Sequence, residues 1–384
     1  MKKVCLPLLA CFATFALTGA VALGAPKTTR HVSTSGTDTG TCITSPCRTI
    51  GYAIAQANAG DTVSVASGIY AESVAVTKRL SLVGNGATVD ATGELNGILI
   101  SGAGAAGTVI QGFTIVNAQL EGIFANKTAD LTIADNVLMQ NDAAGPFDPL
   151  CINQPDDCGE ALHLQTVTHS TVSGNLVQDN VGGILLTDED GPTSENTIRN
   201  NRVLDNSKDC GITLASHWFQ FGAPVSPDVS GIYKNKIVDN ISNGNGAAGI
   251  GVFAGPPGAA AWGNLVQGNT ATGNGLPGIA IHSHTAFQNV NDNVIVNNTV
   301  GGNGPDDDLE ELDPSADGPT GISVMADVLT VFPPVLPASA IQRTVITANH
   351  ISDEEFGIFT LGATSISGLP SNKFSSVAVP ITNH

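Results

Sequence analysis

The stretch Asn175-Leu-Val-Gln-Asp-Asn180 is the clearest sign of the architecture, because its frame recurs along the chain. Each copy begins with an asparagine, continues with mostly apolar residues and ends with a second asparagine. Six segments share this frame: Asn136–Asn141 (NVLMQN), Asn175–Asn180 (NLVQDN), Asn201–Asn206 (NRVLDN), Asn235–Asn240 (NKIVDN), Asn264–Asn269 (NLVQGN) and Asn293–Asn298 (NVIVNN). Asn349–Glu354 is a degraded seventh copy. Such self-similarity is typical of a solenoid, in which each repeat stacks on the next.

A short β segment follows each copy. It usually opens with Gly-Ile, as at Gly122, Gly183, Gly211, Gly249, Gly278, Gly321 and Gly357, while Ala161-Leu162 takes this place in the second coil. Short β-branched runs separated by Gly and Asn are typical of strands joined by turns. Stacking them places like residues in ladders ~4.8 Å apart. The sequence therefore predicts an all-β parallel β-helix with asparagine ladders.

The N-terminal part of the chain resembles a known superfamily. The residues that carry this resemblance are His31-Val-Ser, Gly36-Thr-Asp38, Pro46-Cys-Arg-Thr-Ile50 and the run from Ala57 to Glu72. They are similar to the first coil of the pectate-lyase-like right-handed β-helix superfamily. The resemblance implies a right-handed β-helix over essentially the whole mature chain. It does not imply one activity, because the superfamily includes lyases, hydrolases, epimerases and adhesins.

The organisation of the chain follows from its N-terminus. Lys2 and Lys3 precede an apolar run and a group of small residues, which predicts a secretory signal peptide over 1–25. Residues 26–384 are then one β-helix domain. The first coil and cap of this domain lie over 30–72. The helical spacing of Ile50, Ala53, Ile54 and Ala57 predicts a short capping helix there. The asparagine-ladder repeats cover about 108–372. We expect a secreted, periplasmic or cell-surface protein without stable membrane insertion.

The charge of the chain limits its partners. The net charge is −19 and becomes −21 once Lys2 and Lys3 leave with the signal peptide. Such a chain repels nucleic acid, which excludes it as a partner. It also repels anionic polysaccharides unless a cation intervenes.

Five cysteines remain in the mature chain. Cys42 with Cys47 and Cys151 with Cys158 are close in sequence, and export makes two disulfides the expected arrangement. Cys210 is left over and is expected to be a buried thiol.

Coil lengths indicate where a site lies. With the first asparagine of each copy taken as equivalent, the spacings are 39, 26, 34, 29, 29 and 56 residues. A minimal coil needs ~20 to 25 residues, so the excess must form loops. The insertions flank the Gly-Ile strands and are expected to wall a groove over them; they cover residues 142–159, 187–195, 215–230, 299–320 and 325–340.

Outward positions on the Gly-Ile strands lie two and four residues after the glycine. The first row is Phe124, His163, Leu185, Thr213, Gly251, Ala280, Ser323 and Phe359; the second is Asn126, Gln165, Thr187, Ala215, Phe253, His282, Met325 and Leu361. A mixed polar and aromatic surface of this kind fits one-sided recognition of a sugar chain. Trp218, His282 and Phe253 are the candidate substrate-binding residues.

Candidate catalytic residues gather near the second to fourth coils: Glu160, His163, Lys208, Asp209 and His217. Hydrolysis of a glycosidic bond needs two carboxylates, which Glu160 with Asp188 or Asp209 would supply. β-Elimination from a uronate needs a base and a cation, for which Lys208 or His217 is the base. The run Asp188-Glu189-Asp190 would then hold Ca²⁺, although three acids in a loop are also typical of a solvated turn.

The motifs of polygalacturonases, alginate epimerases and the main pectate lyases are absent, so no catalytic residue is transferred from the superfamily. The sequence predicts an exported protein that binds a polysaccharide, with cleavage by a lyase or glycoside hydrolase left open. The alternative is a non-catalytic surface or periplasmic adhesin or scaffold.

Overall fold

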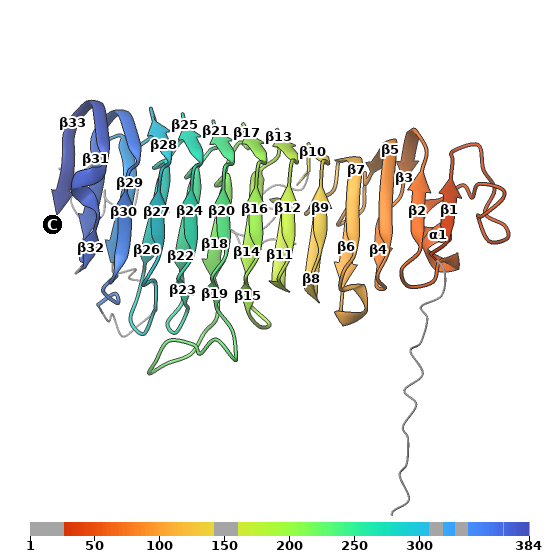
Figure 1. Ribbon diagram of the computed structural model, residues 1–384, viewed down its shortest axis with the longest axis horizontal. Coiled ribbons are helices and arrows are strands. Elements are labelled where there is room, and N and C mark those ends of the chain that lie inside the picture. The colour runs from red at the N-terminus through yellow and green to blue at the C-terminus, as the bar shows by residue number, and fades with distance from the viewer. Residues whose placement is uncertain (1–26, 142–159, 307–317, 327–336, 364, 384) are drawn as a thin grey trace, which may run out of the picture.

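The protein is a solenoid whose coils stack along a single axis (Figure 1). The computed structural model describes residues 27–141, 160–306, 318–326, 337–363 and 365–383. Each pairing between its named strands is parallel, and the 33 strands form one continuous hydrogen-bonded sheet that winds around the axis. The predicted all-β parallel β-helix is confirmed.

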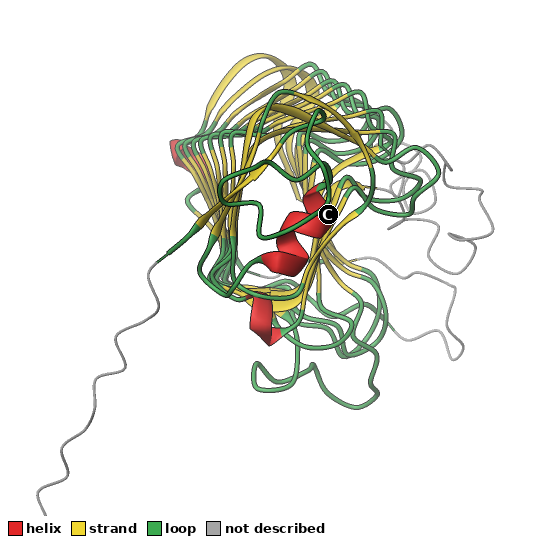
Figure 2. Ribbon diagram, turned by 90° about the vertical axis from the view of Figure 1, so that its right-hand side faces the viewer, coloured by secondary structure: helices red, strands yellow, loops and turns green. Residues whose placement is uncertain are grey.

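Each central coil has three faces, which superpose when the molecule is viewed end on (Figure 2). Face A holds the Gly-Ile strands: Val74–Val76 (β4), Ile98–Ser101 (β6), Ile123–Ala129 (β8), Glu160–Thr168 (β11), Gly182–Thr187 (β14), Ile212–Ser216 (β18), Ile250–Ala254 (β22), Ile279–Ser283 (β26), Thr320–Ala326 (β29) and the end of His350–Leu361 (β31).

Face B follows face A along the chain. It holds Thr132–Ala134 (β9), Thr171–Ser173 (β12), Thr197–Arg199 (β16), Lys236–Val238 (β20), Leu265–Gln267 (β24), Val294–Val296 (β27), Thr344–Thr347 (β30) and Ile366–Ser367 (β32). Three short strands join the two faces: Thr193–Ser194 (β15), Ile232–Tyr233 (β19) and Ala261–Trp262 (β23).

Face C completes the coil. It holds Val137–Met139 (β10), Leu176–Gln178 (β13), Arg202–Leu204 (β17), Ile241–Asn243 (β21), Thr270–Thr272 (β25), Thr299–Gly301 (β28), the start of β31 and Lys373–Asn383 (β33). The first coils are built from Thr29–Val32 (β1), Thr62–Val65 (β2), Gly68–Ala71 (β3), Ser81–Asp90 (β5) and Val109–Val116 (β7). Within the described residues, 3₁₀ turns lie at Ala103–Ala105 and Leu369–Ser371.

Inward side chains of face A form continuous apolar rows along the axis. Ile184, Ile212, Ile250 and Ile279 stack in register, and each is almost completely buried. Burial of apolar surface contributes roughly 25 cal/mol per Å², so these rows supply much of the stabilisation. The predicted alternation of inward and outward residues on this face is confirmed.

Three ladders of buried asparagines mark the corners of the coils. In each ladder the side-chain oxygen of one residue accepts from the backbone and side-chain amides of the residue one coil earlier, as Asn240 does from Asn201 at 3.0 Å. The first ladder contains Asn136, Asn175, Asn201, Asn240, Asn269, Asn298, Asn349 and Asn372. The second contains Asn141, Asn180, Asn206, Asn245, Asn274, Asn303 and Glu354. The third contains Asn196, Asn235, Asn264 and Asn293, and it is preceded by Ser170, which donates only its backbone N–H to Asn196.

The predicted alignment of the repeats is wrong at its fourth copy. Asn201 pairs with Asn240, whereas Asn235 pairs with Asn196. The first three copies therefore form face C, and the last three form face B. The physical reason is that asparagines recur every five residues, as at 235, 240 and 245, so a slip of one corner preserves the pattern. The coil lengths along the first ladder are 39, 26, 39, 29, 29, 51 and 23 residues.

The N-terminal end of the helix is capped as predicted. Ile50–Gln56 (α1) begins after Thr49, whose hydroxyl accepts the Tyr52 N–H, and it buries Ile50, Ala53 and Ile54. The disulfide between Cys42 and Cys47 ties the chain just before this helix.

Several other predictions concern the termini and the remaining cysteines. Cys210 is a buried free thiol, and burial raises its pKa well above the usual value. Residues 1–25, with the predicted signal peptide, and the predicted Cys151–Cys158 disulfide lie outside the described residues. Within the described ranges, no helix is long and apolar enough to cross a membrane.

Candidate functional site

Both outward rows of face A are present with the predicted register. In the first row His163 pairs with Phe124 and Leu185, and in the second Gln165 pairs with Asn126 and Thr187; the pairing continues through both rows to Phe359 and Leu361. The rows are less open than a groove requires, because most of their side chains are buried, with His163 5% and His282 4% exposed. The polar groups of this face are therefore the candidates for a site.

The side chains of two predicted catalytic residues lie on either side of a glycine. Glu160 begins β11 and pairs with Gly182 of β14, while Asp209 precedes β18 on the next coil. A Cβ atom at Gly182 would lie 3.0 Å from Cγ of Glu160 and 3.4 Å from Cβ of Asp209. Any other residue at this position would therefore crowd both side chains. Glu160 is 3% exposed, and Asp209 is half-buried beside the exposed Lys208.

A third carboxylate, which the sequence reasoning missed, lies one coil before Glu160. Glu121 is buried and precedes Ile123 by two residues, as Glu160 precedes Leu162, and these strands pair in register. Its Oε1 lies 3.5 Å from Nδ1 of His163. A glutamate directly before the Gly-Ile or Ala-Leu pair in two successive coils was the available signal.

Two groups of polar side chains lie on neighbouring coils here, around His163 and around Glu189. Nε2 of His163 lies 2.8 Å from Oγ1 of Thr187. Glu189 accepts from Gln165 Nε2 at 2.9 Å and lies 2.8 Å from Nδ1 of His217. Burial acts to raise the pKa of Glu189, but the hydrogen bonds from His217 and Thr187 outweigh it and hold the pKa at about 2.

Asp188 turns inward instead of joining its neighbours in the loop. Its carboxylate accepts from Ser216 Oγ at 2.9 Å, the His217 N–H at 2.7 Å and Ser230 Oγ at 3.1 Å. Burial raises its pKa to about 6, although the hydrogen bonds from His217 and Ser216 lower it. Asp188 therefore anchors the loop that carries His217.

The three acids of the predicted calcium site face three different partners. Asp188 is bound to the next loop, Glu189 to His217 and Gln165, and Asp190 forms an exposed ion pair of 3.0 Å with Lys127. Among the described residues, no group of three His, Cys, Asp or Glu side chains is arranged to hold a metal ion. Calcium binding by this run stays a prediction.

Predicted substrate-binding residues lie in two separate places. Trp218 follows His217 and donates to Gln220 Oε1 at 3.2 Å, and the loop beyond it exposes the edge-to-face pair Phe219 and Phe221. Phe253 and His282 lie on later coils of face A.

The later coils of face A carry an aromatic cluster. The rings of Phe253 and His282 are 5.3 Å apart, and that of His284 lies 6.2 Å from Phe253. Nε2 of His282 lies 3.0 Å from a carboxylate oxygen of the buried Asp306.

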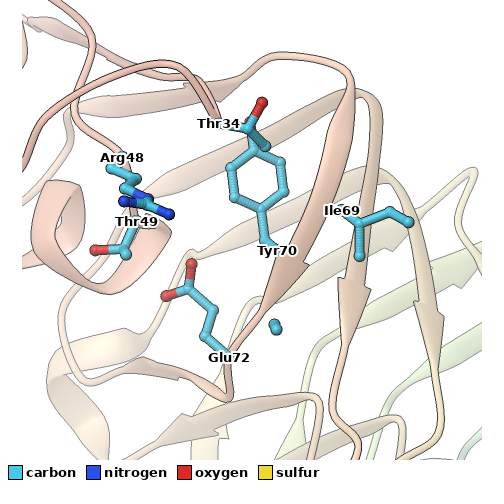
Figure 3. Close-up of a pocket in the computed structure, with 7 residues that line it drawn as sticks. Thr34, Arg48, Thr49, Ile69, Tyr70 and Glu72 are labelled. Atoms are coloured by element: carbon cyan, nitrogen blue, oxygen red, sulfur yellow. The ribbon is translucent and has the colours of Figure 1, made fainter.

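A pocket of about 240 Å³ lies away from face A's polar groups, in the first coil (Figure 3). Arg48, Tyr70 and Glu72 line it, together with Thr34, Thr49, Ile69 and Ala71. The Glu72 carboxylate accepts the first backbone N–H groups of α1, those of Ile50 and Gly51. None of the predicted site residues lines this pocket.

Comparisons with known proteins show to which family the chain belongs. Residues 85–300 match the family model described as a right handed beta helix region. The chain belongs to this right-handed β-helix family. No curated protein matches it.

Solved structures of similar shape include two A-modules of Azotobacter vinelandii mannuronan C-5 epimerases. The AlgE6 module has a TM-score of 0.56 and 13% identity, over 87% of this chain and 94% of that one. The AlgE4 module has a TM-score of 0.55 and 14% identity, over 84% and 88%. The catalytic domain of a GH87 α-1,3-glucanase in complex with nigerose has a TM-score of 0.51 and 13% identity, over 94% and 68%. At these identities the likeness shows the fold alone.

Proposed function

We propose that this chain is an exported β-helix protein that binds a polysaccharide over face A and hydrolyses it. Glu160 and Asp209 are the catalytic pair. The observation that carries the proposal is their approach from two sides of Gly182. A Cβ atom at Gly182 would lie 3.0 Å from Cγ of Glu160 and 3.4 Å from Cβ of Asp209, so the two side chains start from neighbouring positions, as the paired carboxyl groups of glycosidases must.

The chemistry needs only these two groups and water. One carboxylic acid donates its proton to the glycosidic oxygen as the C1–O bond breaks. The other carboxylate takes a proton from the water that attacks C1, so that one water molecule is added for each bond cleaved. Gln165 lies five residues further along β11 than Glu160, and it and the His217–Glu189 pair offer donors and acceptors for sugar hydroxyls at the other end of face A.

The charge of the protein favours an uncharged polysaccharide. A net charge of −19 repels a polyuronate, and of the nearby cations Lys127 already pairs with Asp190. The fold is compatible with polysaccharide chemistry, since the structures of similar shape include a mannuronan epimerase and an α-1,3-glucanase. Calcium with β-elimination remains the competing reaction.

A non-catalytic glycan-binding role is the second candidate, and the exposed pair Phe219 and Phe221 favours it. Aromatic rings on a projecting loop are suited to stacking on sugar rings without any reaction. In this role Glu160 and Asp209 would take no part in a reaction.

The deciding experiment is an activity screen of the purified mature protein against neutral and anionic polysaccharides, with calcium and with chelator. New reducing ends without unsaturated product support hydrolysis, and Glu160→Gln and Asp209→Asn should each lower that activity by at least about 100-fold. Asp205→Asn, at an exposed position nearby, is the matched control and should retain it. Calcium-dependent unsaturated product would overturn hydrolysis in favour of a lyase. Glycan binding without turnover would support the second candidate.

A further inference from the structure

The first coil has a pocket of its own, several coils away from the carboxylates Glu160 and Asp209. The pocket holds about 240 Å³ and lies between the residues that precede α1 and those at the end of β3. Figure 3 shows the side chains of Arg48, Tyr70 and Glu72 around it. Since no candidate catalytic residue lines this pocket, the proposed hydrolysis does not account for it.

Two walls of the pocket are held in place by hydrogen bonds. The ring of Tyr70 is buried, and its hydroxyl donates to the carbonyl oxygen of Ala66 at 2.8 Å. The Glu72 carboxylate accepts the backbone N–H groups of Ile50 and Gly51, at 2.8 and 2.9 Å. These N–H groups are therefore not offered to a ligand, and recognition falls to the side chains. Walls fixed in advance reduce the entropy that binding must cost.

Arg48 and Glu72 offer complementary groups to the same space. Arg48 is exposed, and within the described ranges its guanidinium forms no ion pair and no hydrogen bond, so its donors are open to a ligand. The carboxylate of Glu72 uses two acceptor positions for α1 and has further lone pairs. Burial raises the pKa of Glu72, and the charge of Asp38 acts in the same direction. An additional donor to this carboxylate would therefore be favourable.

The chemistry of the pocket favours a neutral ligand that carries hydroxyl groups. A hydroxyl accepts from a guanidinium and donates to a carboxylate, so two neighbouring hydroxyls of one sugar residue satisfy both side chains. An anion is disfavoured, because Asp38 and Glu72 outnumber Arg48 here and the whole chain carries a charge of −19. The volume lies below the ~300–1,000 Å³ of pockets for drug-sized ligands, which limits the occupant to about one sugar residue.

We propose that this pocket is a second glycan-binding site, in which Arg48 donates to one hydroxyl of a neutral sugar residue and Glu72 accepts from the next. The site would bind without cleaving, because hydrolysis needs two carboxylates. The other carboxylate nearby, Asp38, accepts the backbone N–H groups of Arg48 and Thr49 and the Thr49 hydroxyl. The inference is independent of the hydrolysis proposed on face A.

The test is a ¹H–¹⁵N correlation titration of the mature protein with D-glucose, D-galactose and D-mannose. A ligand of one sugar residue is expected to bind with a Kd of about 1–10 mM. The backbone amides of Ile50 and Gly51 report on the site directly, because both donate to Glu72. We expect at least one of the three sugars to shift these two signals saturably. D-Galacturonate and glycine represent the competing ligand classes, an acidic sugar and an amino acid.

Variants locate the binding. Arg48→Gln and Glu72→Gln should each weaken it at least about tenfold. Arg79→Gln is the matched control, because Arg79 is exposed in the same region and does not line the pocket. Glu160→Gln should leave binding at this site unchanged, which separates it from face A. If Glu72→Gln does not fold, Arg48→Gln decides, since its side chain is exposed.

Three results would overturn the proposal. They are unshifted Ile50 and Gly51 signals with all three neutral sugars, shifts that only galacturonate or glycine produces, and an unchanged Kd in Arg48→Gln. Failure here is distinct from failure of the proposed function, because polysaccharide turnover without these shifts leaves the hydrolysis on face A intact. Saturable shifts without any turnover would support this site and overturn the hydrolysis.

Discussion

Asn303 donates both its backbone N–H and its side-chain amide to Oε1 of Glu354, at 3.1 and 2.9 Å. Glu354 thus occupies the place of an asparagine at the end of the second ladder. Its other oxygen, Oε2, is buried and makes no hydrogen bond among the described residues. A carboxyl group in this position must either lose its charge or remain buried as a poorly compensated anion.

This substitution predicts a pH-dependent stability. Burial raises the pKa of Glu354 to about 7, against the hydrogen bonds from Asn303 that lower it. Because the folded pKa exceeds the unfolded value, the stabilising contribution is complete below about pH 4.5 and is lost as the pH rises through about 7. Glu354→Gln should raise the melting temperature by a few degrees at pH 8 and change it little at pH 5. Glu355→Gln, at the exposed neighbouring position, is the control. Equal shifts at both pH values would contradict this assignment.

The asparagine ladders should contribute strongly to stability at each central position. Asn240 accepts from Asn201 through Oδ1, and its own Nδ2 donates to the carbonyl oxygen of Ile198 and to Asn269. Asn240→Ala would leave these buried groups without partners, at a cost of about 3 kcal/mol in the free energy of unfolding. Denaturant unfolding measures this loss. Gln267→Ala, at a half-buried position of β24, should cost less than about 1 kcal/mol. Comparable losses in the two variants would argue against the ladder as a main source of stability.

The sequence predicted which residues of face A point outward, but it did not predict correctly which asparagines of neighbouring coils stack on each other. Strand residues alternate between two faces, so one Gly-Ile pair determines which residues point outward, and both rows are paired as expected. The ladder register was ambiguous because asparagine recurs every five residues on two sides of the coil. Only the pairing of Asn240 with Asn201 distinguishes the alternatives.

The candidate site stays a prediction. Glu160 was expected to pair with Asp188 or Asp209, and the approach of Glu160 and Asp209 depends on the missing side chain of Gly182, a contact between coils. The relation of Glu121 to Glu160 is visible only once the two coils are placed in register, with Ile123 beside Leu162. The burial of His163 depends on which segments pack over the sheet, and residue patterns do not specify that.

Two isoleucines in neighbouring coils test the inward and outward assignment. Ile250 on β22 is fully buried between Ile212 and Ile279, whereas Ile241 on β21 is 39% exposed. Ile250→Asp would bury an unpaired carboxylate in the core and should lower the free energy of unfolding by more than about 4 kcal/mol, or prevent folding. Ile241→Asp should cost less than about 1 kcal/mol. Thermal melting of the two variants measures the difference, and similar melting temperatures would contradict the register.

The run Asp188-Glu189-Asp190 offers a comparison between a structural anchor and a metal site. Asp188 accepts from Ser216 and Ser230 and from the backbone of His217, whereas Asp190 forms an exposed ion pair with Lys127. Asp188→Ala would leave buried donors without an acceptor, and we expect a loss of about 3 kcal/mol together with faster hydrogen exchange over residues 216–231. Asp190→Ala should change stability by less than about 1 kcal/mol, because exposed ion pairs contribute little.

Calcium separates the two interpretations of this run. If Asp188 is a structural anchor, calcium should not matter. For each variant, the difference in melting temperature from the wild-type protein should then be the same with calcium as with chelator. A shared metal site predicts that calcium stabilises the wild-type protein and that Asp190→Ala abolishes this gain, because a ligand that binds only the folded state raises its stability. Since Asp188, Glu189 and Asp190 face different partners, we expect the first result. Calcium-dependent stabilisation lost in Asp190→Ala would instead show that the three carboxylates converge on an ion.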